Sequence, residues 1–375
     1  MDDYVWPSYF FGLNTSIEDL LAALNVTSIE DFLDKYDYVD AIPPVVHHLS
    51  PSSRVVLILL YVVIFCLGVV GNVLVISVVV INKQMQTVTN VFIVSLSISD
   101  LMVTLVSVPF TLLEAITAGW ILGLFMCKLV SFLTVLSSTS SVLTLMCIAL
   151  DRYNAICQPY KSRVLQSNKR AIQLLSAVWV ISVIIALPLL YVSSLREITD
   201  IRDGKEYALC VENWYSSSQK MAFTFFVVAM TYLVPLALMV VLYARIWHYL
   251  WVKNTITSEF HQMASSAAKR KKKATQMLIL VVFLFFVCWT PYHIVTIRRE
   301  FPKFIDNETN RLILAFITLL AFSNSFNNPI VYAFLNGNFK QCFLATLKCK
   351  NVRHENVNCD TLHPPHGDGG EEGVN

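Results

Sequence analysis

The chain has 375 residues, of which 55% are hydrophobic and only 14% are charged. Soluble domains carry about 25% charged residues, and a soluble protein of this length could not hide so much apolar surface from water. The composition therefore excludes a soluble globular protein, excludes intrinsic disorder for most of the chain, and indicates that lipid is the main solvent. The formal net charge is only +2, and we expect no nucleic-acid partner.

The first 53 residues are acidic, with nine Asp and Glu side chains against one base, Lys35. Two similar segments begin at Thr15 and Thr27, and each places a Ser three residues before an Asp. This spacing is close to a helix-capping signature, and helical apolar periodicity follows it. The pattern predicts an N-terminal extracellular tail with two short amphipathic helices; a mostly disordered glycosylated tail is the alternative. No apolar run precedes Val55, so we expect no cleaved signal peptide.

Charge-poor stretches recur along the rest of the chain, each with the length of about 20 apolar residues that a membrane span needs. Lipid offers no partners to unpaired backbone groups, so each stretch is expected to be helical. The sequence predicts an all-α membrane protein, with a seven-transmembrane helix bundle over residues 54–335. The expected spans are 55–81, 90–117, 127–150, 171–193, 221–244, 274–297 and 312–335.

Basic residues are concentrated in two connecting segments, 151–170 and 245–273. Segments rich in Lys and Arg stay on the cytoplasmic side of a membrane, which places the N-terminus outside and the C-terminus inside. We therefore expect a multi-pass protein of the plasma membrane. Three N-glycosylation sequons agree, because all fall on the expected outer side: Asn14, Asn25 and Asn307.

The segment after the last span is first amphipathic and then polar. We expect a short amphipathic eighth helix over 336–349, in contact with membrane lipids, and a disordered cytoplasmic tail over 350–375. Cys342 and Cys349 belong to the expected helix and are candidates for palmitoylation.

Two of the nine cysteines, Cys127 and Cys210, lie at outer ends of expected elements, where oxidation is feasible. A disulfide between them would tie the top of the third span to the second outer loop. Two unpaired thiols are the alternative. Cysteines within the spans are most simply small apolar packing residues.

Asp100 is the ionisable residue placed deepest in a span. A charge is costly inside a membrane, so Asp100 is a candidate functional residue. Polar residues of other spans lie at a similar depth: Asn72, Ser141, Asn324 and Asn328. Carboxylate, hydroxyl and amide oxygens suit a small hard cation, so the pattern favours a Na⁺ site and we expect no other cofactor. A protonated carboxyl that is hydrogen-bonded within a polar core is the alternative.

Short motifs occur in order along all the expected spans. They are Gly71-Asn72-Val73, Leu96 to Asp100, Trp120 with Cys127-Lys128, Asp151-Arg152-Tyr153, Trp179, Pro235 with Tyr243, Phe285 to Pro291, and Asn328 to Tyr332. Together they resemble the rhodopsin-like (class A) G-protein-coupled receptors across essentially the whole chain. The resemblance implies a receptor rather than an enzyme, with a heterotrimeric G protein (Gq or Gi) and arrestin as partners.

Further segments narrow the resemblance to the RFamide neuropeptide receptors. This likeness is carried by Thr87 to Phe92, Cys288 to His293 and Phe322 to Phe334. The doubled N-terminal element looks like that of receptors for pyroglutamylated RFamide peptides, as does Cys210 to Trp214. Residues 155–164 look more like cholecystokinin receptors. The implied ligand is an extracellular, C-terminally amidated RFamide-type peptide, and a cholecystokinin-like or other peptide is the alternative.

The resemblance also implies roles in activation. Arg152 would engage the G protein once the sixth helix swings outward, and Tyr243 and Tyr332 would support that state. Trp289, beneath Pro291, would be the switch under the ligand pocket. The other members of these motifs are Asp151, Tyr153, Phe285, Asn328 and Pro329.

For the ligand, the resemblance implies one ion pair above all. In RFamide receptors an acid at the top of the sixth helix pairs with the arginine of the peptide, and Glu300 occupies that place. Thr111 matches a position near the terminal amide of the peptide. The expected ligand-binding residues are Thr111, Glu114, Thr134, Glu212, Trp289, Tyr292, His293, Thr296, Glu300 and Thr318.

Some positions depart from the family pattern. Thr134 stands where RFamide receptors typically carry Gln. Arg298 and Arg299 crowd Glu300 with positive charge, which would weaken its attraction for a basic ligand. Lys271 stands where some relatives carry an acid that latches the G-protein-binding arginine, so we expect no such latch and some basal activity.

Other classes fit the sequence less well. Spans without inverted repeats argue against a transporter, the runner-up class, and Asp100 has no second mid-span carboxylate to form a catalytic pair. A retinal-binding light receptor needs a lysine in the seventh span, and residues 312–335 contain none. An amine receptor needs an acid at position 134, where there is Thr.

Overall fold

The computed structural model describes residues 49–117, 119–158, 167–199, 205–257, 262–301, 308–335 and 339–343. The chain divides into two compact units, one made of 1–46 with 197–207 and one made of 47–196 with 208–375. The second unit contains the long helices. The repeated N-terminal segments lie outside the described residues, so their helices remain a prediction.

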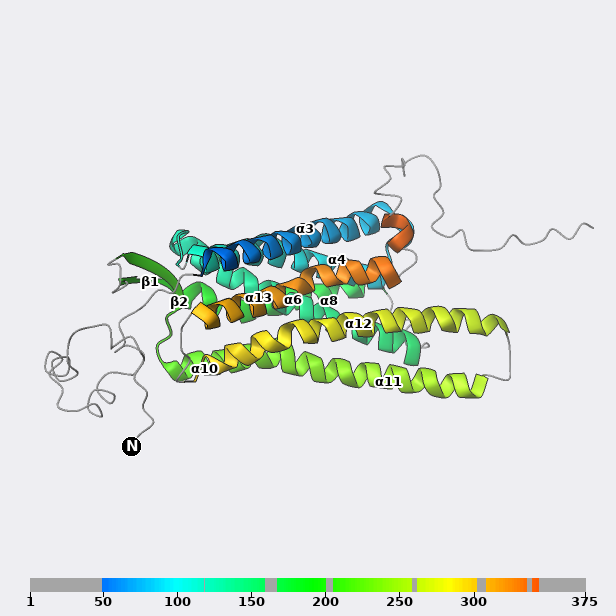
Figure 1. Cartoon of the computed structure of the whole chain (residues 1–375). Coiled ribbons are helices and arrows are strands. Elements are labelled where there is room, and N and C mark those ends of the chain that lie inside the picture. The colour runs from blue at the N-terminus through cyan, green and yellow to red at the C-terminus, as the bar shows by residue number, and fades with distance from the viewer. Residues whose placement is uncertain are drawn as a thin grey trace, which may run out of the picture. The chain divides into compact units, whose positions relative to one another are not determined.

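Seven helical spans, each long and apolar enough to cross a membrane, are found among the described residues, as expected. Figure 1 shows their long helices lying alongside one another. They are α3 (Pro51–Ile81), α4 to α5 (Val88–Thr117), α6 (Gly123–Cys157), α8 with α9 (Asn168–Ala186 and Pro188–Val192), α10 to α11 (Ser217–Thr257), α12 (Gln262–Arg298) and α13 (Glu308–Leu335).

Several helices extend beyond the apolar runs from which they were predicted. The third was expected over 127–150 and is helical over Gly123–Cys157, and the sixth was expected over 274–297 and is helical over Gln262–Arg298. Hydropathy detects only the lipid-embedded part of a helix, whereas hydrogen bonds along the backbone continue into the polar region. The first span begins at Pro51, where the Ser50 hydroxyl accepts a hydrogen bond from the Ser53 amide and caps the helix.

Two spans contain a turn of π-helix directly before a proline. In the second span, η3 (Val103–Ser107) separates α4 (Val88–Met102) from α5 (Val108–Thr117), which carries Pro109. In the fifth span, η4 (Ala229–Leu233) separates α10 (Ser217–Val228) from α11 (Val234–Thr257), which carries Pro235. Proline lacks an amide donor and clashes with the carbonyl four residues earlier, so a wider turn relieves the clash. Pro291 and Pro329 lie inside α12 and α13.

A small β-sheet is the one feature of the described residues that an all-helical expectation did not contain. Strand β1 (Ser193–Thr199) pairs with β2 (Glu206–Glu212). Cys210 of β2 forms a disulfide with Cys127 near the start of α6, which confirms the expected bridge. The Trp120 amide also donates to the Ala208 carbonyl at 2.6 Å, so covalent and hydrogen bonds both join β2 to the third span.

Apolar side chains and small polar residues together fill the inside of the bundle, while further large apolar side chains cover its outside. A Cβ atom on Gly71 would lie 2.8 Å from Pro329, so α3 and α13 approach closely only because this residue is glycine. Several hydroxyls of the polar third span bond to their own helix, for example Ser138 to the Thr134 carbonyl at 2.7 Å. This arrangement lets a serine-rich helix occupy the centre of the bundle.

Candidate functional site

The two ends of the bundle carry different kinds of functional residue. We call the end with the Cys127–Cys210 disulfide the disulfide end, and the end with Asp151 and Arg152 at the close of α6 the Arg152 end. Because α6 runs from Gly123 to Cys157, these groups lie at opposite ends of one long helix.

An aromatic cluster of α12 and η4 lies toward the disulfide end. The Trp289 ring centroid lies 5.5 Å from that of Tyr292 and 5.8 Å from that of His293, and Tyr232 lies 4.7 Å from His293. Phe285 lies one turn before Trp289 in α12, and their ring centroids are 6.0 Å apart. Four of the residues expected in the ligand and switch sets thus form one contiguous group.

Two buried nitrogen atoms in this cluster lack partners. The indole nitrogen of Trp289 and Nδ1 of His293 make no hydrogen bond with any residue that the structure describes. Buried polar atoms are normally paired, and an unpaired one is destabilising by about 1–3 kcal/mol. These atoms can therefore gain hydrogen bonds from the polar groups of a ligand.

Glu300, at the end of the sixth span, already has two partners. Its Oε1 atom lies 3.5 Å from Nζ of Lys220 and accepts a hydrogen bond from the Thr224 hydroxyl at 3.2 Å. Its side chain is only 8% exposed. The sequence predicted that Arg298 and Arg299 would be the positive charges beside Glu300. In the structure, the ion pair with Glu300 is formed by Lys220 of α10.

Lys220 is a residue that sequence reasoning missed. It lies at the start of the fifth span, 80 residues from Glu300, and only the packing of α10 against α12 brings the two together. No local pattern indicates such a contact. A charged residue in the first turn of an otherwise apolar span was the only available signal.

The other acids of the disulfide end have different surroundings. Glu114 is exposed, and the positive charges of Arg299 and Arg311 act on it. Glu212, at the end of β2, accepts a hydrogen bond from the Trp214 indole at 2.7 Å. Acids and bases alternate here, so this end can bind a ligand that carries both charge and aromatic groups.

The expected threonines are distributed between the second, third, sixth and seventh spans. Thr134 shares a hydrogen bond of 2.7 Å with Ser107, which links α6 to η3. Thr296 donates to the Tyr292 carbonyl at 2.9 Å. Thr111 and Thr318 are half-buried. Thr134 is therefore one member of a hydroxyl pair that is already hydrogen-bonded.

The polar group around Asp100 is assembled much as expected. Ser141 donates to Oδ1 of Asp100 at 3.2 Å, and Asn328 donates to Oδ2 at 2.8 Å. Oδ1 of Asn324 is buried without a partner among the described residues. Asn72 instead donates to the Gly68 and Ser325 carbonyls, so it joins α3 to α13. A buried carboxylate that contacts a hydroxyl and a side-chain amide fits a hard cation such as Na⁺.

Arg152 is held by its neighbour in the chain. Its Nη2 atom forms an ion pair with Oδ2 of Asp151 at 2.9 Å, and Thr89 of α4 donates to the same oxygen at 2.9 Å. Its Nε atom is buried and unpaired within the described part of the chain. The side chain of Lys271 lies outside the described residues, so the absence of a latch to α12 stays a prediction.

Two tyrosines near Arg152 have buried hydroxyls without partners. Tyr243 of α11 and Tyr332 of α13 are almost wholly buried, and neither hydroxyl is hydrogen-bonded to a described residue. The Tyr332 ring stacks on Phe339 at 5.6 Å. Phe339, Cys342 and Phe343 are buried in the short helical segment 339–343, which is all that the structure describes of the expected eighth helix.

The modification sites remain largely outside the described residues. Asn14, Asn25, Asn307 and Cys349 all lie there. Cys342 is described and is a buried cysteine that forms no disulfide with a described residue. Glycosylation and palmitoylation therefore stay predictions.

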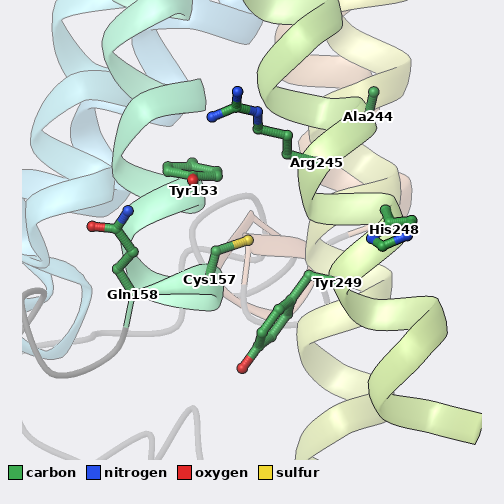
Figure 2. Close-up of a pocket in the computed structure, with 7 residues that line it drawn as sticks. All are labelled: Tyr153, Cys157, Gln158, Ala244, Arg245, His248 and Tyr249. Atoms are coloured by element: carbon green, nitrogen blue, oxygen red, sulfur yellow. The ribbon is translucent and has the colours of Figure 1, made fainter.

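A pocket of about 690 Å³ opens at the Arg152 end between α6 and α11. Figure 2 shows its lining side chains. They are Tyr153, Cys157, Gln158, Ala244, Arg245, His248 and Tyr249. Of these, only Tyr153 was among the expected functional residues.

Comparison with known proteins agrees with this arrangement. The model of the rhodopsin family of seven-transmembrane receptors matches residues 71–332. The chain is 40% identical to a QRFP-like peptide receptor of Branchiostoma floridae, over 94% of this chain and 92% of that one. It is 35% identical to the pyroglutamylated RF-amide peptide receptor of Mus musculus, over 90% and 80%, and 31% identical to galanin receptor type 1 of Rattus norvegicus, over 82% and 84%. The chain therefore belongs to the rhodopsin family of seven-transmembrane receptors, the class A G-protein-coupled receptors, and is a membrane-embedded receptor rather than an enzyme or a transporter.

Proposed function

We propose that this receptor is activated by an extracellular, C-terminally amidated peptide of the RFamide type. The observation that carries the proposal is its identity, over at least 90% of the chain, to a QRFP-like peptide receptor (40%) and to a pyroglutamylated RF-amide peptide receptor (35%). The disulfide end then faces the outside of the plasma membrane together with the N-terminus, and the Arg152 end faces the cytosol. The excess of Lys and Arg in 151–170 and 245–273 supports this orientation.

Peptide recognition centres on an exchange of ion pairs at Glu300. In the absence of peptide, Lys220 holds this carboxylate at 3.5 Å, and the peptide arginine takes its place on binding. A guanidinium binds a carboxylate through two parallel hydrogen bonds, which an ammonium cannot form. The replacement is therefore favourable, although Lys220 lowers the net gain.

The aromatic cluster receives the end of the peptide. The face of Trp289 and the ring of Tyr292 provide a surface for a phenylalanine side chain. The unpaired nitrogen of His293 offers a hydrogen bond to the terminal amide. Thr111 and the Ser107–Thr134 pair lie on the second and third spans, where they contribute further hydroxyls. The N-terminal segments add a lid over the bound peptide.

Activation follows from a shift between two states of the bundle. A peptide that binds better to the state with an outward sixth helix raises the population of that state and exposes the G-protein site. Trp289 contacts Phe285, which lies deeper in α12, so rearrangement at the aromatic cluster reaches the bundle interior. The unpaired hydroxyls of Tyr243 and Tyr332 gain partners in that state, which stabilises it. Gq or Gi and arrestin are the proposed cytoplasmic partners.

Asp100, Ser141, Asn324 and Asn328 are the residues that would hold a sodium ion. The bound ion would supply a positive charge that compensates the buried carboxylate. The hydrogen bonds from Ser141 and Asn328 orient the two oxygens of Asp100, and the unpaired Oδ1 of Asn324 adds a further donor atom. This group lies between the aromatic cluster and the Arg152 end, because its residues stand at mid-span.

The test is a ligand screen in cells that express the receptor. We expect calcium release or a fall in cAMP with an amidated RFamide peptide, and a response at least about tenfold weaker with the same peptide as a free acid, because the amide hydrogen bonds are lost. Mock-transfected cells and a sulfated cholecystokinin-type peptide are the controls. Equal potency of amide and free acid, or a preference for the cholecystokinin-type peptide, would contradict the proposal.

A further inference from the structure

The pocket between α6 and α11 is lined by basic side chains and by no acidic ones. Its lining includes two residues with cationic capacity, Arg245 and His248, and contains neither Asp nor Glu. Arg245 is exposed and forms no ion pair or hydrogen bond with the residues that the structure describes. Figure 2 shows its guanidinium reaching from α11 into the gap toward Tyr153 of α6. The donors of this guanidinium are therefore unpaired within the described part of the chain, in a residue that lines the pocket.

Further hydrogen-bond donors line the same pocket. Tyr153 and Gln158 bring a hydroxyl and an amide from the end of α6, and neither is hydrogen-bonded through its side chain within the described part of the chain. Ala244 and the ring of Tyr249 add apolar surface on α11. The pocket thus combines donors for an anionic group with apolar walls.

The pocket lies at the depth where lipid head groups meet the protein. Val240 and Val241 are exposed on the outside of α11, one turn before Arg245, and belong to the apolar surface of the bundle. Beyond Arg245, Trp247 and Trp251 are 53% and 67% exposed. Tryptophan is enriched at the boundary between the membrane core and water, so these two residues mark that boundary on α11. Arg245 therefore lies between the hydrocarbon region and the cytosol.

We infer that this pocket binds the phosphate-bearing head group of an anionic phospholipid of the cytoplasmic leaflet. Basic pockets between transmembrane helices on the cytoplasmic side bind such head groups, and a guanidinium pairs with phosphate through two parallel hydrogen bonds. The apolar walls and the neighbouring exposed valines accommodate the adjoining glycerol and acyl chains. The inference rests on the proposed orientation of the bundle, but not on the identity of the peptide.

Native mass spectrometry of the purified full-length receptor tests the inference directly. The probe is phosphatidylinositol 4,5-bisphosphate, compared with phosphatidylcholine. We expect the wild type to retain the anionic lipid and Arg245→Gln to bind it about fivefold more weakly, since one basic residue near a membrane surface contributes that factor. Lys83→Gln is the matched control, because Lys83 is an exposed base at the same end of the bundle between α3 and α4. Arg245→Lys should recover part of the affinity.

Cys157 provides a second readout inside the pocket. It is a free cysteine of intermediate exposure. In receptor-containing nanodiscs, the anionic lipid should slow alkylation of Cys157 by a maleimide severalfold, as followed on its own peptide by mass spectrometry. In Arg245→Gln the lipid should give no protection, whereas in Lys83→Gln protection should persist.

Three results would overturn the inference. Equal loss of lipid in Arg245→Gln and Lys83→Gln would show that net charge, and not this pocket, attracts the lipid. Binding of soluble inositol trisphosphate as tight as that of the lipid would identify a soluble phosphate as the occupant. Protection of Cys157 only when a G protein is added would identify a protein partner. Because none of these readouts uses peptide, a failure of the proposed ligand would leave them unchanged.

Discussion

The disulfide end and the Arg152 end differ in which of their polar groups are paired. At the disulfide end, Glu300 and Glu212 both have hydrogen-bond partners, supplied by Lys220, Thr224 and Trp214. At the Arg152 end, the hydroxyls of Tyr243 and Tyr332 are buried without described partners, as is one nitrogen of Arg152. A ligand that binds Glu300 or Glu212 must therefore displace existing partners, whereas the ring nitrogens of Trp289 and His293 and the hydroxyls of Tyr243 and Tyr332 can gain partners without losing any among the described residues.

The disulfide anchors the first of these regions, and its removal should have the largest effect. Cys127→Ser should lower the free energy of unfolding by about 3–4 kcal/mol, because the bridge closes a long loop in the unfolded chain. Thermal unfolding of the purified receptor measures this change. Cys66→Ser, at an exposed free cysteine, is the control and should leave stability unchanged. Similar behaviour of the two variants would show that the bridge does not hold β2 to the third span.

The Asp100 group lies between the two regions and should couple them through sodium. In the wild type, added Na⁺ should weaken agonist binding about tenfold, an ordinary size for an allosteric coupling. Asp100→Asn should abolish this dependence, because the amide carries no charge to hold the ion. Radioligand competition in sodium chloride and in choline chloride measures the effect. Persistence of the sodium effect in Asp100→Asn would exclude this site.

At the Arg152 end, removing an unpaired hydroxyl should leave the unliganded receptor intact and weaken signalling. Tyr243→Phe should lower the efficiency of G-protein activation about fivefold, because it removes one hydrogen bond that forms only in the active state. Peptide affinity without G protein should not change. Nucleotide exchange on a purified G protein provides the measurement, with Tyr191→Phe, an 88% exposed tyrosine, as control. Full activity of Tyr243→Phe would mean that its hydroxyl stays unpaired in both states.

At the disulfide end, removing the competitor of the ligand should have the smallest effect. Lys220→Met should raise the potency of arginine-containing peptides about threefold, since a partly exposed ion pair is worth little. A peptide without arginine should show no gain. Dose-response curves with both peptides measure the difference. A loss of potency for the arginine peptide would show that Lys220 helps to position Glu300.

The sequence was sufficient to predict the helices and the buried polar group, for clear physical reasons. Lipid requires every backbone group to be hydrogen-bonded within the protein, and an apolar run of about 20 residues meets this requirement as a helix, so these runs identified all seven spans. Asp100, Ser141 and Asn328 were predicted to meet because charges in a span require partners, and they do meet. The β1–β2 pair was not predicted, since it lies in a polar connecting segment where hydropathy carries no signal.

The sequence was insufficient wherever distant helices supply a contact. Lys220 pairs with Glu300 only because α10 packs against α12, and no spacing in the chain reveals this. Arg245 was counted only as one of the positive charges that set orientation, although it lines a pocket with Tyr153. For Arg245 the rule for membrane orientation already explained a positive charge, whereas no rule of sequence pointed to Lys220.

A double-mutant cycle between receptor and peptide tests the ion-pair exchange at Glu300 most directly. The receptor change is Glu300→Gln, and the peptide change replaces the arginine before the final phenylalanine amide by norleucine. We expect each single change to weaken binding. The combined change should weaken binding hardly more than either single change does, which corresponds to a coupling energy between Glu300 and the peptide arginine of at least about 1.5 kcal/mol. Losses that simply add would mean that Glu300 does not bind the arginine of the peptide.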